Sequence, residues 1–120
     1  MKTTKQIGDA GEDQATSLLL KEGYTIVARN FRTRFGEIDI IAKDGKTLVF
    51  IEVKKKNSDY FGSAAEMITK RKLLKVINIA KVYAQEKDYS GPWRVDAVLI
   101  NKNSIELVKN LTSNSEEPVG

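Results

Sequence analysis

The sequence predicts an α/β fold in which one mixed β-sheet is flanked by helices, with elements in the order α-β-β-β-α-β-β. Three observations lead to this prediction. Apolar residues recur at helical spacing near the amino terminus and again after residue 69, an Asp-Gly pair separates two strand-like runs, and Gly91-Pro92 divides the second helical region from two further strand-like runs. Elements in this order place helices against a single sheet. At 120 residues the chain is the size of one ordinary domain.

The amino-terminal region begins with a predicted helix over Thr4–Glu22, whose apolar residues lie three or four positions apart. Gly23 follows where helices commonly end, because glycine readily adopts the left-handed conformation. The β-branched and aromatic residues of Tyr24–Phe31 predict the first strand. Arg32–Gly36 is expected to form a loop.

Two more strands are expected over Glu37–Ala42 and Thr47–Lys55. Asp44-Gly45 lies between them, and Asp-Gly between apolar runs is the strongest short-range signal of a β-hairpin. If these two residues form the turn, Lys43 pairs with Lys46. This pair fixes the register of the whole hairpin.

The predicted register brings acidic side chains together on one face. Because side chains alternate along a strand, Glu37 and Asp39 share a face with Phe50, Glu52 and Lys54. Asp39 faces Phe50 and is a diagonal neighbour of Glu52, about 7–8 Å away at Cα, whereas Glu37 directly opposes Glu52, where like charges repel. A cation between the carboxylates would turn that repulsion into binding. The other face is wholly apolar and should pack against a helix; it carries Ile38, Ile40, Ala42, Val49, Ile51 and Val53.

Clustered acids beside a lysine on half-buried strands indicate a functional site. The alternative is an exposed sheet face on which Lys54 and its neighbours merely offset the acids. Spacing alone favours the site but leaves the alternative open.

Two helical segments follow the hairpin. Ser63-Ala-Ala-Glu66 has the form of a capping box that opens a helix. Thr69 is expected to cap a second segment that runs to about Glu86. The expected buried side of this segment consists of Leu73, Val76, Ile77, Ala80, Tyr83 and Ala84.

The last strands are expected over Trp93–Ile100 and Ser104–Leu111, joined by a turn at Asn101–Asn103. On the first of them, Arg94 and Asp96 share a face and are expected to form a buried ion pair. The domain should span residues 1–111, with residues 112–120 as a disordered tail.

The composition narrows the possible chemistry. The chain has neither histidine nor cysteine, which excludes structural zinc sites, thiol nucleophiles and Ser-His-Asp triads. A metal held by oxygen ligands alone would be a hard cation, Mg²⁺ or Mn²⁺. No segment resembles a signal peptide or a membrane span, so we expect a cytoplasmic protein that does not bind membranes.

The net charge of +4 is concentrated in three basic segments. A basic surface suggests a polyanionic partner, nucleic acid and DNA above all. On charge alone, an ordinary solvated surface is an equally good explanation. The candidate nucleic-acid contacts are Arg32, Arg34, Lys55, Lys56, Arg71, Lys72 and Lys75.

Two runs, Gly36-Glu37-Ile38-Asp39 and Phe50-Ile51-Glu52-Val53-Lys54, resemble the core of the PD-(D/E)xK nucleases, which have a restriction-endonuclease-like fold. More closely, the chain resembles the YraN family of bacterial proteins, which is related to Holliday junction resolvases. The resemblance covers about residues 8–100. It also rests on Gly11-Glu12, Arg29-Asn30, Phe61-Gly62, the helix that contains Lys72, and Arg94-Val95-Asp96.

The resemblance implies a catalytic set of Asp39, Glu52 and Lys54. Asp39 and Glu52 would bind Mg²⁺ or Mn²⁺ together with the Val53 carbonyl, and Lys54 would lie near the attacking water or the scissile phosphate. Glu12 matches a first-helix acid that often completes the metal site, although a solvated helix residue is an equally good interpretation. Two positions depart from the pattern. Ile38 replaces the nominal proline, and Lys56 stands where arginine is frequent, which keeps the charge but weakens a phosphate contact.

The sequence therefore predicts a metal-dependent endonuclease that hydrolyses phosphodiester bonds, with branched or structured DNA among its candidate substrates. The alternative is a nucleic-acid-binding module that keeps the nuclease-like fold without activity. A third hypothesis, a protein-interaction domain, leaves the basic segments unexplained. The sequence leaves open whether the protein forms a homodimer.

Overall fold

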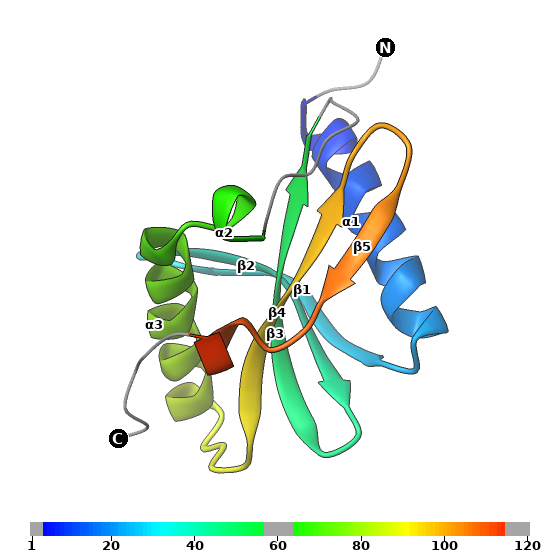
Figure 1. The fold of residues 1–120 in the computed structure, drawn as a ribbon. Coiled ribbons are helices and arrows are strands. Elements are labelled where there is room, and N and C mark those ends of the chain that lie inside the picture. Colours follow the sequence, from blue (N-terminus) through cyan, green and yellow to red (C-terminus); the bar gives the residue numbers. More distant parts are fainter. Residues whose placement is uncertain (1–3, 57–63, 115–120) are drawn as a thin grey trace.

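The computed structural model describes residues 4–56 and 64–114. The elements are α1 (Thr4–Lys21), β1 (Thr25–Thr33), β2 (Gly36–Asp44), β3 (Thr47–Lys55), α2 (Ala64–Met67), α3 (Lys70–Glu86), β4 (Trp93–Ile100), β5 (Ile105–Val108) and a 3₁₀ helix, η1 (Leu111–Asn114). The strands form one sheet in the order β1-β2-β3-β4-β5, in which only β3 and β4 are parallel (Figure 1). The predicted mixed α/β fold and order of elements are confirmed.

Helices cover both faces of the sheet and create two apolar cores (Figure 1). On the α1 side, Ala15 and Leu19 pack with central strand residues such as Ile51. On the α3 side, Val76 and Phe50 belong to the larger core. Because β2, β3 and β4 are buried on both faces, they contain the long apolar runs seen in the sequence. Within the described residues, no helix is long and apolar enough to cross a membrane.

Helix α3 begins as predicted. The Oγ1 of Thr69 accepts a hydrogen bond from the backbone N–H of Lys72 (3.1 Å), which satisfies one of the free amide groups of the first turn. The buried side of the helix also includes Ile79, which the sequence analysis left out. The capping box predicted for the preceding helix begins at Ser63, which lies outside the described residues. Phe61 and Gly62, which belong to the family resemblance, also lie outside them.

Three predicted boundaries differ from the structure. The expected loop at Arg32–Gly36 is a tight turn at residues 34–35, because β1 and β2 continue to pair up to Thr33 and Gly36. The last strand is shorter than expected and ends at Val108. Residues 112–114, expected in a disordered tail, belong to η1, which the buried side chain of Leu111 anchors to the α3-side core. Residues 115–120 lie outside the described residues.

The predicted hairpin register is wrong by two residues. Asp44 pairs with Thr47, so the turn consists of Gly45 and Lys46, with Gly45 at a φ of 63°. Asp44 stays in the strand because its carboxylate binds Arg94 at 2.7 Å. A register shift of an even number of residues does not by itself move any side chain to the other face of the sheet.

The face predicted for Ile38 is also wrong. Ile38 lies in the α3-side core, whereas Ile40 lies in the α1-side core. Their partners on β1 are Phe31 and Arg29, and the residue between these partners, Asn30, has a φ of 56°. A left-handed residue interrupts the alternation of side chains, so both strands change faces at this point.

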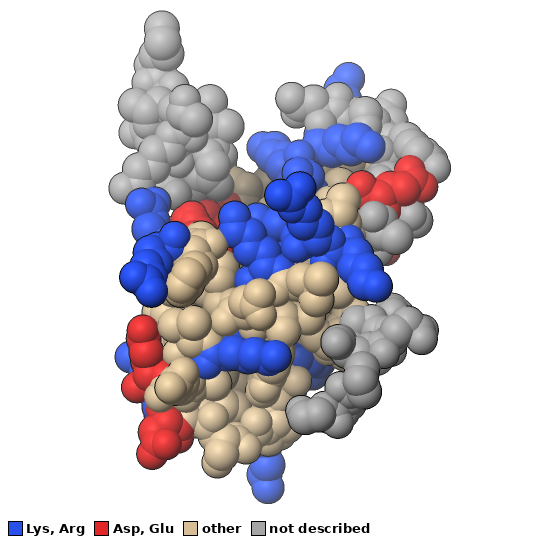
Figure 2. Space-filling view, turned by 90° about the vertical axis from the view of Figure 1, so that its left-hand side faces the viewer, with Lys and Arg blue, Asp and Glu red and all other residues tan. Residues whose placement is uncertain are grey.

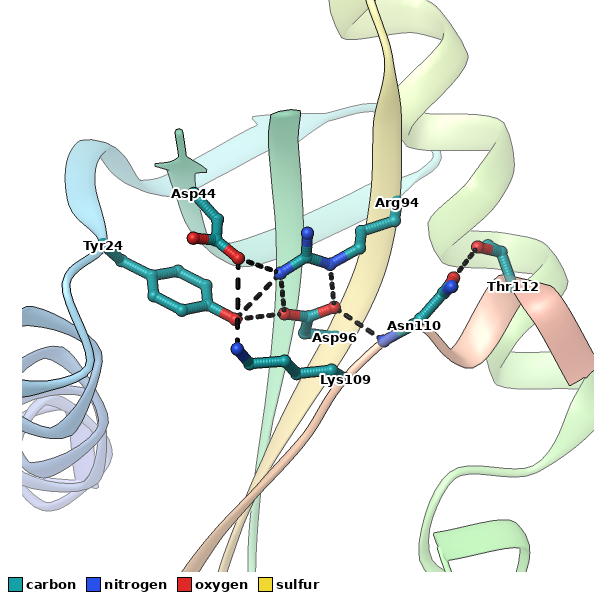
Figure 3. A network of polar contacts seen from close by, with 7 residues as sticks. All are labelled: Tyr24, Asp44, Arg94, Asp96, Lys109, Asn110 and Thr112. Atoms are coloured by element: carbon teal, nitrogen blue, oxygen red, sulfur yellow. Dashed lines mark hydrogen bonds and ion pairs between the residues drawn. The ribbon is translucent and has the colours of Figure 1, made fainter. Parts of the chain in front are cut away.

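A buried polar network joins β4 to the segments beside it (Figure 3). The carboxylate of Asp96, which is fully buried, accepts hydrogen bonds from the Tyr24 hydroxyl (2.7 Å), the Arg94 Nε (3.0 Å) and the Asn110 N–H (2.8 Å). The same guanidinium also binds Asp44 at 2.7 Å. The predicted ion pair between Arg94 and Asp96 is confirmed.

Two members of the network, Tyr24 and Arg94, have raised pKa values. Burial and the hydrogen bond to Asp96 raise the pKa of Tyr24, so the phenol remains a donor. Burial lowers the pKa of Arg94, but its contacts with Asp96 and Asp44 raise that pKa by more, so the guanidinium remains charged. The buried Asp96 carboxylate therefore lies beside the charged guanidinium of Arg94.

Replacing Arg94 with methionine should lower the free energy of unfolding by about 3–5 kcal/mol, because the buried Asp96 carboxylate would lose its charge partner. Equilibrium denaturation in urea measures this change. The matched control is Arg32→Met, which removes a guanidinium that is 72% exposed and pairs with Glu37 at 3.4 Å; such a pair contributes about 1 kcal/mol or less. Equal losses in the two variants would contradict the structural role of the buried pair.

Candidate metal and nucleic-acid site

The candidate site lies where β2 and β3 separate. The two strands pair from Asp44 and Thr47 as far as Ile40 and Ile51. Beyond that point β2 continues beside β1, whereas β3 continues beside β4, and the two pairs of strands diverge (Figure 1). The divergence opens a gap in the hydrogen-bonded ladder beside Asp39.

The Asp39 side chain takes the place of the missing backbone partner. Its Oδ2 accepts a hydrogen bond from the backbone N–H of Val53 at 2.8 Å. This bond satisfies an amide group that would otherwise lack a partner, and it fixes the orientation of the carboxylate. The Val53 carbonyl should face the same strand edge as its N–H, because both groups of a strand residue point to one side.

Asp39 and Glu52 open into one pocket, as the alternation along the two strands predicts. The side chain of Glu52 is only 10% exposed. The remaining lining residues are Arg32, Thr33, Gly36, Glu37 and Lys72.

Both carboxyl groups are harder to ionise than usual. Burial raises the pKa of Glu52 to about 7, and the negative charge of Asp39 adds to the effect, while Lys72 and Lys54 oppose it. Burial likewise raises the pKa of Asp39; the Val53 N–H lowers it, and Glu37 raises it further. Two acids whose charged forms are disfavoured by burial, and in Glu52 also by the charge of Asp39, are suited to receive a cation.

Lys72 supplies the closest positive charge. Its Nζ lies 3.6 Å from Oε2 of Glu52. Lys72 is one of the nucleic-acid contacts that the sequence predicts, and the first turn of α3 brings it into the pocket with the two acids. Nothing in the spacing of the sequence links residues 52 and 72, because the link depends on how α3 packs on the sheet.

Contacts place two of the three consecutive lysines at the end of β3. Lys54 is exposed and close enough to lower the pKa of Glu52. Lys55 lies near α1, where its Cδ is 3.8 Å from the position that a Cβ on Gly11 would occupy. Lys56 is exposed, and its N–H donates to the carbonyl of Ile100 (2.8 Å). Of these two placed lysines, Lys54 is therefore the one whose charge acts on Glu52.

Glu12 does not join the pocket. Its carboxylate lies 3.6 Å from the guanidinium of Arg29, which also binds Asp13 at 2.8 Å. In residues 4–56 and 64–114, no three acidic side chains are grouped closely enough to hold a metal ion. Asp39 and Glu52 therefore line the pocket together, and the ion pairs of Arg29 with Glu12 and Asp13 join β1 to α1.

The outer basic residues gather around the amino-terminal half of α3. Figure 2 shows a band of lysine and arginine across the upper part of this face. Arg71 and Lys75 line a shallow groove on α3. Arg32 lines the pocket itself, and Arg34 is at the tip of the β1–β2 turn. These four residues lie on the side of the molecule onto which the pocket opens.

The pocket suits a divalent cation with oxygen ligands. Two carboxylates with raised pKa values and one strand carbonyl are hard donors, and Mg²⁺ typically binds one or two protein carboxylates while water and substrate phosphate complete its shell. A cation between Asp39 and Glu52 would also offset the negative charge of Asp39, which adds to the raised pKa of Glu52. The residues present fit such a cation.

Comparisons with known proteins agree with this fold. The structure resembles the Holliday junction resolvase of Archaeoglobus fulgidus with a TM-score of 0.53 and 19% identity, over 82% of this chain and 74% of the resolvase. At this level of identity the likeness shows the restriction-endonuclease-like fold.

Sequence relatives are much closer. A UPF0102 protein of Hahella chejuensis is 48% identical over 99 residues, 82% of this chain and 80% of the relative. A UPF0102 protein of Nitrosomonas eutropha is 43% identical over 111 residues, 92% of this chain and 96% of the relative. Residues 11–100 match the model described as Uncharacterised protein family UPF0102. The chain therefore belongs to the UPF0102 family, the YraN family of the sequence analysis.

Proposed function

We propose that this protein is a divalent-cation-dependent endonuclease that hydrolyses phosphodiester bonds in nucleic acid, with branched or structured DNA as its favoured substrate. One observation carries the proposal: Asp39 and Glu52 are buried together in an open pocket beside the ammonium group of Lys72. The resolvase-like fold supports it, because this fold can present such a pocket to a nucleic-acid backbone.

Asp39 and Glu52 would hold the cation, with the Val53 carbonyl as a third oxygen. A bound Mg²⁺ or Mn²⁺ lowers the pKa of its water and neutralises charge that develops on the phosphate. Because the Val53 N–H already holds Oδ2 of Asp39, the other oxygen of that carboxylate is left for the cation. The hydrogen bond thus prepares the ligand before the cation arrives.

The two lysines have different tasks. Without a cation, the ammonium group of Lys72 offsets part of the charge of Glu52. Once a cation binds the Glu52 carboxylate, the same ammonium group would bind a phosphate oxygen. Lys54, exposed on the same side as Glu52, would orient the attacking water or stabilise charge on the reacting phosphate. Both lysines would act on the reacting group rather than on the length of the nucleic acid.

The surrounding basic residues would hold the phosphate backbone without reading its sequence. Arg32 lines the pocket, Arg34 is in the turn after β1, and Arg71 and Lys75 line the neighbouring groove on α3. A strand laid across the pocket and the groove would therefore meet positive charge. The alternative, a binding module without activity, does not explain the acids. A module that only binds phosphates gains nothing from two buried carboxylates at the centre of its surface.

The direct test is a cleavage assay over duplex, single-stranded and branched DNA and RNA, with Mg²⁺, Mn²⁺ or EDTA. We expect cation-dependent cleavage that Asp39→Asn and Glu52→Gln each reduce by about 10²–10³-fold or more. The matched control is Glu22→Gln, which removes an exposed acid that does not line the pocket and should retain cleavage. Cation-independent binding with no cleavage of any substrate would favour the inactive binding module.

Replacing Lys54 with alanine should reduce the cleavage rate by about 10²–10³-fold and leave affinity for DNA nearly unchanged, because one charge contributes little to a backbone-wide interaction. The double variant Arg71→Ala/Lys75→Ala should do the reverse and should flatten the salt dependence of binding. Paired cleavage and binding titrations over a range of salt concentrations distinguish the two. Wild-type cleavage by Lys54→Ala would refute the role given to this residue.

The affinity for Mn²⁺ should rise with pH between about 5 and 7 and level off above, because below a pKa of about 7 the Glu52 carboxyl holds a proton that the cation must displace. Without a cation, the folded state binds this proton more tightly than the unfolded chain, whose glutamate has the ordinary pKa of 4.5. The free energy of unfolding should therefore fall as the pH rises through this window.

Electron paramagnetic resonance of free Mn²⁺, with urea denaturation in EDTA at each pH, measures both effects. Glu52→Gln should weaken Mn²⁺ binding and remove this share of the pH dependence of stability. Mn²⁺ binding by Glu52→Gln as tight as that of the wild type would exclude Glu52 as a ligand.

A further inference from the structure

We propose that Phe35 and the groove beside it on α3 bind an unpaired nucleobase next to the scissile phosphodiester. The inference rests on the proposed function and narrows its substrate to DNA that has unpaired nucleotides at the site of cleavage. It starts from an exposed aromatic ring. The Phe35 side chain is 54% exposed, and it is the only aromatic side chain among the described residues that is exposed to this degree.

The ring borders an apolar groove with a charged rim. Phe35, Leu74 and Val82 form its apolar lining, and Leu74 is itself 42% exposed. Its basic residues are Lys70, Arg71 and Lys75. A nucleotide combines a flat apolar base with an anionic phosphate, so its two parts match the lining and the rim of this groove.

The turn that carries the ring is held in a fixed conformation. The Thr33 hydroxyl accepts a hydrogen bond from the Phe35 N–H (3.0 Å) and donates one to the Gly36 carbonyl (3.1 Å). Gly36 has a φ of 135°, and a Cβ there would lie 2.9 Å from Cε of Lys75. The absence of a side chain at this position lets α3 pack directly against the turn, so the ring and the helix form one surface.

The groove adjoins the candidate site, because residues next to one another in the chain line the two. Gly36 and Thr33, which fix the turn, also line the pocket of Asp39 and Glu52. On α3, consecutive residues divide between the two: Arg71 lines the groove, whereas Lys72 lines the pocket. A strand whose phosphate lies at the carboxylates can therefore place a neighbouring base at the groove.

Stacking is the interaction that the ring offers to such a base. The guanidinium of Arg34 lies over the ring, 5.0 Å from its centroid. An aromatic ring between a cation and a base holds the base by its flat face, which makes the contact independent of sequence. In a duplex the base is already stacked, so only an unpaired nucleotide gains from the contact.

Equilibrium binding in EDTA, where cleavage is blocked, tests the proposal with three labelled DNAs: a duplex, the same duplex ending in a fork of unpaired adenosines, and the same fork with abasic arms. The wild type should prefer the adenosine fork. Phe35→Ala should weaken its binding to that fork by roughly 5- to 100-fold, with little change for the duplex or the abasic fork. Phe35→Trp should keep the preference, and Leu20→Ala, which shortens an exposed side chain on α1, serves as the control.

Equal weakening of Phe35→Ala on adenosine and abasic forks would overturn the proposal, as would wild-type affinity of this variant for the adenosine fork. If Phe35 instead contacts a second copy of the chain, sedimentation would show that Phe35→Ala changes the oligomeric state without a dependence on bases, which also overturns it. Because the assay needs no cleavage, a base-dependent effect of Phe35→Ala supports the proposal even if no substrate is hydrolysed. Salt-dependent binding and cleavage without that effect would leave the nuclease function intact.

Discussion

The separation of β2 from β3 after the pair formed by Ile40 and Ile51 is the constraint on which the candidate site depends. A separated ladder leaves backbone groups without partners, and a buried amide without one costs about 1–3 kcal/mol. The Asp39 side chain avoids this cost, because its carboxylate accepts a hydrogen bond from the Val53 N–H. One hydrogen bond thus satisfies the sheet and points a carboxylate into the pocket.

The rest of the fold holds this open ladder in place. The buried network around Asp96 fixes the other end of β2 through the contact between Arg94 and Asp44. Packing of α3 on the sheet then brings Lys72 to Glu52. The acids are therefore kept close together by parts of the structure that take no part in chemistry, and the cost of burying them appears as their raised pKa values.

Much of the fold could be predicted from periodicity and local signals. The apolar runs predicted the strands, and Thr69 predicted the start of α3. The alternation of side chains on β2 and β3 predicted that Asp39 and Glu52 lie on one side of the sheet. The turn was misplaced because an Asp-Gly pair predicts a turn locally, whereas Asp44 is held in the strand by an arginine 50 residues away. The change of faces at Asn30 and Ile38 depends on a single left-handed residue that no periodicity reveals.

The parts of the site that come from distant segments were least predictable. Lys72 had been counted as one basic residue among several on α3, and its place beside Glu52 follows only from the packing of that helix. For Glu12, the resemblance left a metal ligand and a solvated helix residue as equal interpretations. The structure places its carboxylate 3.6 Å from Arg29, a contact that depends on how α1 packs beside β1. Phe35 lies in Arg32–Gly36, which the sequence predicts as a loop, and no periodicity shows whether a side chain in a loop is exposed.

The most direct measurement of the central claim is the anomalous diffraction of crystals soaked in Mn²⁺ near pH 8, above the raised pKa of Glu52. The account predicts a manganese peak in the pocket, with one oxygen each from Asp39 and Glu52 at the roughly 2.0–2.2 Å typical of small divalent cations. A peak at Glu12 and Asp13 instead, or no peak at saturating Mn²⁺, would contradict it.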